Sequence, residues 1–316
     1  MSTPIHWLGN IEGNRIWIKR EDLLPFSFGG NKARKAELFM REIKNGGYDC
    51  VVTYGTSSSN HCRVISNLCV SHGLPCYVIS PSEKSDPTYN SVMTALFKAQ
   101  TTTVPAQEVH DTIENKMREL EKSGYRPYFI EGGGHGKLGT EAYVQCYEEI
   151  KEYEIEKGIR FDYIFLASGT GTTQAGLVCG QLADGAKRQV IGISIARRNP
   201  RGREVVLDCV RLYFAALGQR ISEKRLQEAV VFIDDYINGG YGLDSVKIRE
   251  TIEWVLKTYG IPLDTTYTGK SFYGMTEYIR QRCVRDRNIL FLHTGGTPLF
   301  FDALKNAERD RREGVI

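Results

Sequence analysis

The stretch Ala167-Ser168-Gly169-Thr170-Gly171-Thr172-Thr173-Gln174-Ala175-Gly176 lies between an apolar run at 163–167 and a helical pattern at 173–182. The apolar run predicts a buried strand, and glycines directly after it permit a tight turn from strand to helix. Backbone N–H groups can converge on an anion in such a turn, and threonine hydroxyls add donors. The stretch has neither the Gly-Lys-Ser/Thr ending of a nucleotide P-loop nor the spacing of a dinucleotide fingerprint. It therefore favours the phosphate of a small cofactor.

Strand and helix patterns alternate on both sides of this stretch. Apolar β-rich runs occur at 50–54, 76–79, 102–105, 128–131, 163–167, 190–195, 230–233 and 289–293. Helical patterns occur at 32–44, 60–71, 89–97, 112–123, 140–156, 173–182, 245–258 and 271–285. This order predicts an α/β protein with mainly parallel twisted sheets and helices on both faces. We expect two three-layer α/β/α domains, a large one at 1–46 plus 140–316 and a small one at 47–139, with the ligand in the cleft between them.

The bulk composition excludes several classes of protein. A net charge of +3 over 316 residues sets no strong field, so we expect no nucleic-acid or membrane partner. The basic residues Arg197, Arg198, Arg201 and Arg203 are predicted to form a solvated loop. No apolar run approaches the roughly 20 residues that span a bilayer. The start, MSTPIHWLGN, lacks the charged and apolar regions of a signal peptide.

The cysteines and histidines give no sign of a disulfide framework or a metal site. None of the eight cysteines forms a C-x-x-C pair, and most lie in apolar stretches. The six histidines show no metal-ligand spacing. We therefore expect reduced thiols, a cytoplasmic location and no bound metal.

Two further glycine- or serine-rich segments open helices. Gly29-Gly30-Asn31-Lys32-Ala33-Arg34-Lys35 places Lys32 at a helix N-terminus, where the helix dipole and the neighbouring Arg34 and Lys35 are expected to lower its pKa. A neutral lysine amine can form a Schiff base. Ser58-Ser59-Asn60-His61 follows the strand at 50–54, and hydroxyls and free amides at a helix start bind a carboxylate.

The remaining segments, Tyr267-Thr268-Gly269-Lys270 and His293-Thr294-Gly295-Gly296, supply a tyrosine and neutral hydroxyls. Together, the segments offer a lysine, a carboxylate site, a phosphate loop and a hydroxyl partner for a ring. Pyridoxal 5'-phosphate (PLP) requires this set of groups.

In this order, the segments resemble the 1-aminocyclopropane-1-carboxylate (ACC) deaminase and D-cysteine desulfhydrase family, PLP enzymes with the tryptophan-synthase-β-like fold (fold type II). The resemblance runs from about Ile18 to Pro298. It implies that Lys32 is the Schiff-base lysine, that Asn60 bonds the 3'-hydroxyl of PLP, and that Ser59 contacts the substrate carboxylate or assists proton transfer. The amides from Gly169 through Thr173 would hold the phosphate. Tyr241 and Tyr267 match two family tyrosines near the substrate and the ring.

Departures from the family pattern bear on specificity. ACC deaminases have glutamate after the second tyrosine, where this chain has Thr268; Thr294 is a second candidate partner for the pyridine nitrogen. His61 stands where deaminases have glutamine. These residues resemble the desulfhydrase branch. The polar run Thr56-Ser57-Ser58, the bulky Phe26-Ser27-Phe28, and His135, which we expect to face the substrate with Ser58, leave open a β-substituent that is larger, more polar or charged.

The resemblance thus implies a PLP-dependent lyase that eliminates the β-substituent of a small amino acid, giving an α-keto acid and ammonia. The alternatives are β-replacement by a second nucleophile, ACC deamination, and a PLP-binding paralogue without catalysis. A homodimer is expected. The enantiomer and the leaving group stay open.

Overall fold

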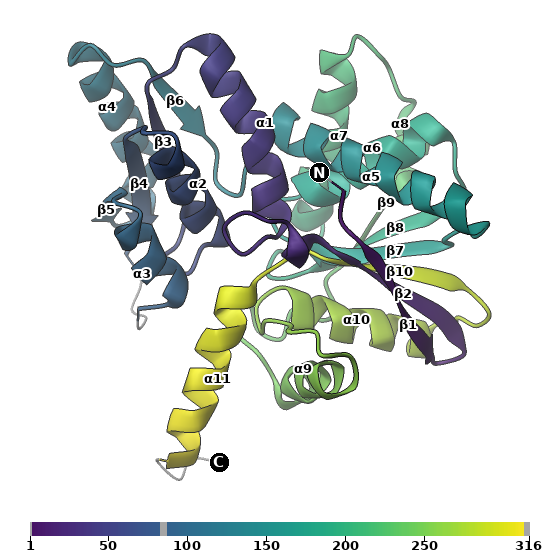
Figure 1. The fold of residues 1–316 in the computed structure, drawn as a ribbon. Helices are drawn as coiled ribbons and strands as arrows, with labels where there is room; N and C mark the ends of the chain where they lie inside the picture. Colours follow the sequence, from purple (N-terminus) through teal and green to yellow (C-terminus); the bar gives the residue numbers. More distant parts are fainter. Residues whose placement is uncertain (1, 83–86, 313–316) are drawn as a thin grey trace.

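The chain folds around two separate sheets. The structure, a computed structural model, describes residues 2–82 and 87–312. One sheet has six strands in the order β1-β2-β10-β7-β8-β9, and the other has four in the order β5-β4-β3-β6. Figure 1 shows the smaller sheet on the left and the larger one on the right, with the first long helix between them.

The six-stranded sheet is parallel except at one edge. Its strands are β1 (Ile5–Ile11), β2 (Asn14–Arg20), β7 (Tyr163–Ser168), β8 (Gln189–Ser194), β9 (Val230–Ile233) and β10 (Asn288–His293). Of these six strands, β1 and β2 pair antiparallel, through a hairpin, and the other neighbours pair parallel. The central β7 and β10 are buried along nearly their whole length, as expected for parallel strands covered on both faces.

The four-stranded sheet is entirely parallel. It consists of β3 (Cys50–Tyr54), β4 (Cys76–Pro81), β5 (Gln100–Val104) and β6 (Pro127–Ile130). The edge strand β5 is polar and mostly exposed, whereas the inner β3 is buried. All four strands lie within 47–139, the segment that we predicted as the small domain; the domain boundary itself stays a prediction.

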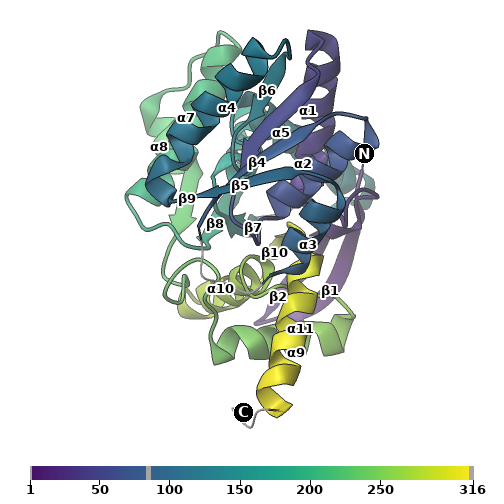
Figure 2. The same cartoon turned by 90° about the vertical axis from the view of Figure 1, so that its left-hand side faces the viewer.

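Helices cover both faces of each sheet. The α-helices are α1 (Asn31–Gly46), α2 (Asn60–Ser71), α3 (Tyr89–Leu96), α4 (Val109–Lys122), α5 (Lys137–Lys157), α6 (Thr172–Asp184), α7 (Arg201–Ala216), α8 (Glu223–Ala229), α9 (Val246–Tyr259), α10 (Thr268–Gln281) and α11 (Thr297–Arg312). Short 3-10 helices lie at Glu21–Leu23 and Ala106–Glu108. Figure 2 shows α11 extending away from the body, with its first turns beside α3.

Alternating side chains of the strands divide the core into layers. On β7, Ile164 and Leu166 pack with α5, α6 and α7, whereas Phe165 packs on the opposite face with α9 and α10. On β3, Val51 packs with α1 and α2, and Val52 packs with α4. Each sheet is therefore the middle layer of an α/β/α sandwich, and the predicted fold class is confirmed.

Every strand and helix predicted above is present, but several elements were not predicted. The hairpin β1–β2 was missed because Arg15, Lys19 and Arg20 interrupt its apolar pattern. Lys19 is nevertheless fully buried, because its ammonium forms an ion pair with Glu149 at 2.7 Å. Helix α7 begins within the basic run that we predicted as a solvated loop, and α8 and α11 were also missed.

Candidate active site

A cavity of about 380 Å³ lies between the two sheets. Its walls are loops that follow the carboxyl ends of parallel strands: β3 and β6 of the small sheet, and β7, β8 and β10 of the large sheet. Ligands bind at this end of the strands in open α/β sheets. Among the described residues, those that line the cavity include no aspartate or glutamate. The lining therefore suits an anionic ligand.

Lys32 enters the cavity from the first turn of α1. The turn before it is tight, because the backbone of Gly30 (φ 92°) passes the loop after β10 so closely that a β-carbon there would lie 2.9 Å from the carbonyl oxygen of Thr294. The Lys32 ammonium donates to the carbonyl of Gly133 at 2.9 Å. Burial lowers the pKa of Lys32 to about 8. Its neutral amine is therefore available near neutral pH.

We expected the charges of Arg34 and Lys35 to lower the pKa of Lys32, but burial is what lowers it. The Arg34 guanidinium points into the core and pairs with Glu21 and Glu149, so its charge is compensated there. Lys35 is buried, and its Nζ donates to the Thr172 hydroxyl at 2.5 Å and to the Gly133 carbonyl at 3.3 Å. Burial, and then the charge of Lys32, lower the pKa of Lys35. The two amines thus share one carbonyl acceptor.

The loop from Gly169 to Thr173 joins β7 to the N-terminus of α6. The N-cap is Gly171 (φ 90°), which offers no side chain to the first amides of the helix. These N–H groups also lack partners within a helix, so they are free to bind an anion. Thr173 accepts a hydrogen bond from the Asn31 amide at 3.0 Å, which ties the loop to the start of α1. Ser168 Oγ borders the cavity, is buried, and has no hydrogen-bond partner among the described residues.

The start of α2 forms the opposite wall. Ser59 caps the helix, because its Oγ accepts from the N–H groups of His61 (3.1 Å) and Cys62 (3.3 Å). Its O–H is then free to donate to a ligand. Asn60 Oδ1 accepts from the Asn90 amide at 3.0 Å. This leaves the Asn60 amide nitrogen as a donor at the cavity.

His61 is neutral, and its tautomer follows from its contacts. The Thr53 hydroxyl donates to the Ile130 carbonyl at 2.7 Å, so its oxygen accepts the proton of His61 Nε2 at 2.8 Å. Nδ1 is therefore unprotonated and can accept a hydrogen bond. Burial holds the pKa of His61 well below its usual value.

Two tyrosines and two threonines complete the site. The hydroxyls of Tyr241 and Tyr267 lie 2.6 Å apart at the cavity. Burial raises the pKa of Tyr267 far above 10.0, so its phenol stays protonated. Thr294 lines the cavity, whereas Thr268 lies behind it and donates to Asp264 Oδ2 at 2.7 Å. The structure therefore favours Thr294 over Thr268 as the hydroxyl that faces a ligand.

Most of the predicted site residues meet at this cavity. Those that line it are Lys32, Ser59, Asn60, His61, Gly169, Thr170, Gly171, Thr173, Tyr241, Tyr267 and Thr294. Ser58, Thr172 and Thr268 lie next to the lining. Phe26 and Phe28 are not part of it: Phe26 packs in the core around α1 and α2, and the Phe28 ring lies 5.7 Å from the Arg63 guanidinium.

His135 does not face the cavity, contrary to our expectation. Its Nδ1 lies 2.8 Å from a carboxylate oxygen of Glu131, and its Nε2 lies 3.2 Å from the Cys209 sulfur of α7. The left-handed backbone of Gly133 and Gly134 (φ 74° and 65°) turns the chain so that His135 points to α7 while the Gly133 carbonyl points to Lys32.

Arg197 and Tyr54 belong to the lining but were not predicted from the sequence as site residues. Arg197, which we assigned to a solvated loop, follows β8 and lines the cavity, and so does Tyr54 at the end of β3. Their positions directly after the strands at 190–195 and 50–54 were the available signal, because side chains at carboxyl ends of parallel strands reach the ligand.

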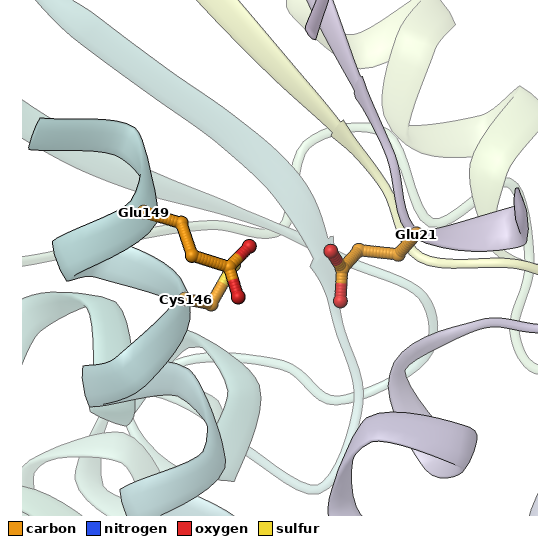
Figure 3. Close-up of side chains that lie close together, drawn as sticks. All are labelled: Glu21, Cys146 and Glu149. Carbon is orange, nitrogen blue, oxygen red and sulfur yellow. The ribbon is translucent and has the colours of Figure 1, made fainter. Parts of the chain in front are cut away.

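A cluster of Glu21, Cys146 and Glu149 lies outside the cavity and has the composition of a metal site. In Figure 3, Glu149 and Cys146 come from one helix and face Glu21. Arg34 donates to both carboxylates, and Lys19 donates to Glu149 at 2.7 Å. These oxygens are already occupied by cations of the chain, so the cluster is an ion-pair network that fixes α1 against α5.

Comparison with known proteins identifies similar chains over nearly the whole length. The family described as "Pyridoxal-phosphate dependent enzyme" matches residues 1–295. A D-cysteine desulfhydrase of Serratia proteamaculans is 31% identical, with 95% of this chain and 93% of that protein aligned. A D-cysteine desulfhydrase of Yersinia enterocolitica is 30% identical over the same shares of the two chains.

Among solved structures, an ACC deaminase homologue superposes with a TM-score of 0.87 at 29% sequence identity. The superposition covers 97% of this chain and 94% of that one. The similarity therefore includes both sheets and the cavity between them.

Proposed function

The chain belongs to the family of pyridoxal-phosphate-dependent enzymes, and we propose that it is a lyase that eliminates the β-substituent of a small amino acid. The products are an α-keto acid, ammonia and the released substituent. One observation carries this proposal: a lysine amine with a pKa of about 8 lies in the same cavity as an uncapped helix N-terminus and the capped start of α2.

The residues of the cavity fit PLP. The free amides at the start of α6 suit the phosphate. Ser168 Oγ, which is buried and has no hydrogen-bond partner in the described part of the chain, indicates a polar ligand. The Asn60 amide nitrogen can donate to the 3'-oxygen, and Thr294 offers a hydroxyl for the ring nitrogen. The volume of about 380 Å³ leaves room for a small amino acid beside the cofactor.

When bound, PLP withdraws electrons from the α-carbon of the attached amino acid, which labilises the α-proton and the β-substituent. The residues of the chain supply the rest. The Ser59 hydroxyl donates to the α-carboxylate, and the Lys32 amine moves the α-proton. The hydroxyl pair of Tyr241 and Tyr267 can donate a proton to the departing group, because the Tyr267 phenol stays protonated. Placement of such acid–base groups contributes about 10²–10⁴ in rate.

Elimination is favoured over opening of a cyclopropane ring. A carboxylate beside the pyridine nitrogen would keep the ring protonated and strongly electron-withdrawing, whereas a threonine hydroxyl does not. The lining formed by the described residues has no carboxylate, and we assign the Thr294 hydroxyl of this lining to the ring nitrogen. A β-carbon with a good leaving group needs less electron withdrawal than ACC, which has none.

A panel of D- and L-amino acids tests this function. It should contain cysteine, β-chloroalanine, serine O-sulfate and ACC, assayed for keto acid, ammonia and, with cysteine, sulfide. We expect elimination from one enantiomer of a β-substituted substrate, with D-cysteine as the first candidate, and little or no turnover of ACC. Efficient ACC turnover would contradict the proposal, and binding of PLP without any turnover would identify a non-catalytic paralogue. Adding nucleophiles and searching for new amino acids separates β-replacement from elimination.

The lowered pKa of Lys32 predicts how the apo-protein takes up its cofactor. Only the neutral amine attacks PLP, so the rate of covalent attachment should rise about tenfold per pH unit up to pH 8 and level off above it. Stopped-flow absorbance of apo-protein mixed with PLP between pH 6 and pH 10 measures this rate. A rate that still rises at pH 10 would mean that the amine keeps its ordinary pKa of 10.5.

Gly171→Ala should weaken PLP binding more than tenfold. Gly171 has φ 90°, and a β-carbon there would lie 3.1 Å from Val205, so the cap of α6 must shift and its amides would leave the phosphate. Gly185→Ala is a matched control, because Gly185 has φ 67° at the other end of α6 and open space around it. Equilibrium titration of each apo-protein with PLP compares them. Equal losses in both variants would show that backbone strain, not the cradle, sets the affinity.

We further propose a cytoplasmic homodimer. The eight cysteines are free thiols, as expected in a reducing compartment. Exposed apolar side chains gather on two neighbouring helices, Tyr89, Val92 and Leu96 on α3 and Phe301 and Leu304 on α11, and such a patch favours association. Within the described residues, no helix has the length and apolar character needed to cross a membrane. Sedimentation of the purified protein tests the oligomeric state.

A further inference from the structure

Arg197 brings a positive charge to the cavity that the proposed function does not yet use. It follows β8, and one of its Nη atoms donates to the carbonyl of Gly169. Among the described residues, no carboxylate forms an ion pair with it, and the lining contributes none. Partial burial lowers the pKa of Arg197 from its usual value, because the charge has lost water without gaining an anion. The remaining N–H donors of the guanidinium are therefore suited to an anionic ligand.

The Gly169–Thr170 peptide separates Arg197 from the proposed phosphate cradle. The C=O of Gly169 and the N–H of Thr170 belong to one trans peptide unit, so they point in opposite directions. Arg197 binds the carbonyl side, and the Thr170 N–H therefore points away from it. If that N–H is part of the phosphate cradle, Arg197 lies on the other side of the peptide. The cradle has a donor of its own nearby, since the Lys35 amine contacts Thr172 in the first turn of α6.

The α-carboxylate is also accounted for. The Ser59 hydroxyl, whose O–H is free to donate, lies in the small-sheet wall, whereas Arg197 lies in the wall of the large sheet. The cavity thus offers three separate groups for negative charge: the N-terminus of α6, the Ser59 hydroxyl at the start of α2, and Arg197. PLP and the α-carboxylate of an amino acid use the first two.

We propose that Arg197 binds an anionic β-substituent and so selects substrates such as β-sulfo-oxy, β-phospho-oxy or thiolate-bearing amino acids. This inference rests on the proposed function. In the reaction, the Cα–H and Cβ–X bonds break, a carbon–carbon double bond forms, and X leaves with the electron pair. One water then supplies the keto oxygen, so that the substrate and water give the α-keto acid, ammonia and HX.

The test compares two substrates that differ in the charge of X. Serine O-sulfate has an anionic substituent, and β-chloroalanine has a neutral one. In Arg197→Gln, kcat/KM for serine O-sulfate should fall about 10- to 100-fold relative to that for β-chloroalanine, as expected for loss of a charge-assisted hydrogen bond. Arg197→Lys should recover part of this ratio. Arg198→Gln, at the exposed neighbouring position, should leave the ratio unchanged.

A binding measurement gives a second readout. 3-Sulfopropionate has a carboxylate and a sulfonate but no amine, so it cannot react. Butyrate is its control, because it has the same carboxylate and a methyl group in place of the sulfonate. Calorimetry on the holoenzyme should show that Arg197→Gln weakens binding of 3-sulfopropionate but not of butyrate. The PLP affinity of Arg197→Gln should stay within about threefold of the wild-type value. This change is smaller than the loss of one charged hydrogen bond would cause.

The outcomes separate the two proposals. If the wild-type protein eliminates neither of these substrates nor cysteine, the proposed function fails. If it eliminates cysteine or β-chloroalanine but neither turns over serine O-sulfate nor binds 3-sulfopropionate more tightly than butyrate, the role of Arg197 is overturned. If it eliminates both serine O-sulfate and β-chloroalanine and Arg197→Gln changes neither the ratio nor the binding of 3-sulfopropionate, the role of Arg197 is overturned. If Arg197→Gln instead loses PLP affinity with an unchanged ratio, Arg197 serves the cofactor and the inference is also wrong.

Discussion

Lys32→Ala should reduce kcat by at least about 10²–10⁴-fold, the effect of removing a placed acid–base group. The variant should still bind PLP without a covalent bond, because the free amides at the start of α6 and the Asn60 amide stay in place. Steady-state assays with the best substrate of the panel measure the loss, and absorbance after gel filtration measures retained PLP.

Lys44→Ala is the matched control for Lys32→Ala, since Lys44 is exposed near the other end of α1. It should keep wild-type turnover. If Lys32→Ala retained turnover within tenfold of the wild-type value, another group would move the α-proton. Lys35 would then be the first alternative, because its amine shares the Gly133 carbonyl with Lys32.

Glu21→Ala should lower the free energy of unfolding by about 3–5 kcal/mol, the usual cost of leaving a buried charge without its partner. Glu21 is fully buried, and its carboxylate accepts from Arg34 at 2.5 and 2.8 Å and from Thr3 at 2.6 Å. Its loss leaves Arg34 with Glu149 alone. Because Arg34 lies on α1 just after Lys32, the variant should also weaken PLP binding. Urea unfolding of the apo-protein measures the first effect.

The pH dependence of the free energy of unfolding also tests the ion-pair network of Glu21, Arg34 and Glu149. Burial raises the pKa of Glu21, but hydrogen bonds and charge from Arg34 outweigh burial, and the pKa is lowered below 4.5. The stabilisation by this carboxylate is therefore complete above about pH 4.5 and is lost as the pH falls through the lowered value. Glu37→Ala removes a more exposed pair with Arg41 on the same helix, so its cost should be within about 1 kcal/mol. Equal costs for Glu21→Ala and Glu37→Ala would contradict the role of the buried network.

The parallel core was predictable because its strands are uninterrupted apolar runs. β7 and β10 are buried on both faces and contain no charged residue. The β1–β2 hairpin escaped the same reasoning because Lys19, in the sheet, is neutralised by Glu149, which is 130 residues away along the chain. The local hydrophobic pattern of a strand cannot reveal an ion-pair partner that lies so far away in the sequence.

The site was predictable where the chemistry resides in a backbone turn. Gly30 and Gly171 adopt positive φ at helix starts, and the sequence marks such positions with glycine. The direction in which a loop side chain points was harder to predict from the sequence. Arg197 and His135 are both polar residues in loops after strands, yet the first lines the cavity and the second bonds Glu131 and Cys209. Only the fold determines which of the two faces the ligand.

Borohydride reduction of the PLP-loaded protein, followed by mass spectrometry of its peptides, tests the central claim most directly. Borohydride fixes the cofactor to the lysine that holds it. We predict a phosphopyridoxyl group on Lys32, whose amine lies in the cavity with a pKa of about 8. Lys270 is the informative competitor, because burial also lowers its pKa to about 8 but three backbone carbonyls occupy its ammonium. A label on Lys270 or Lys35, or no label on any lysine, would contradict the account.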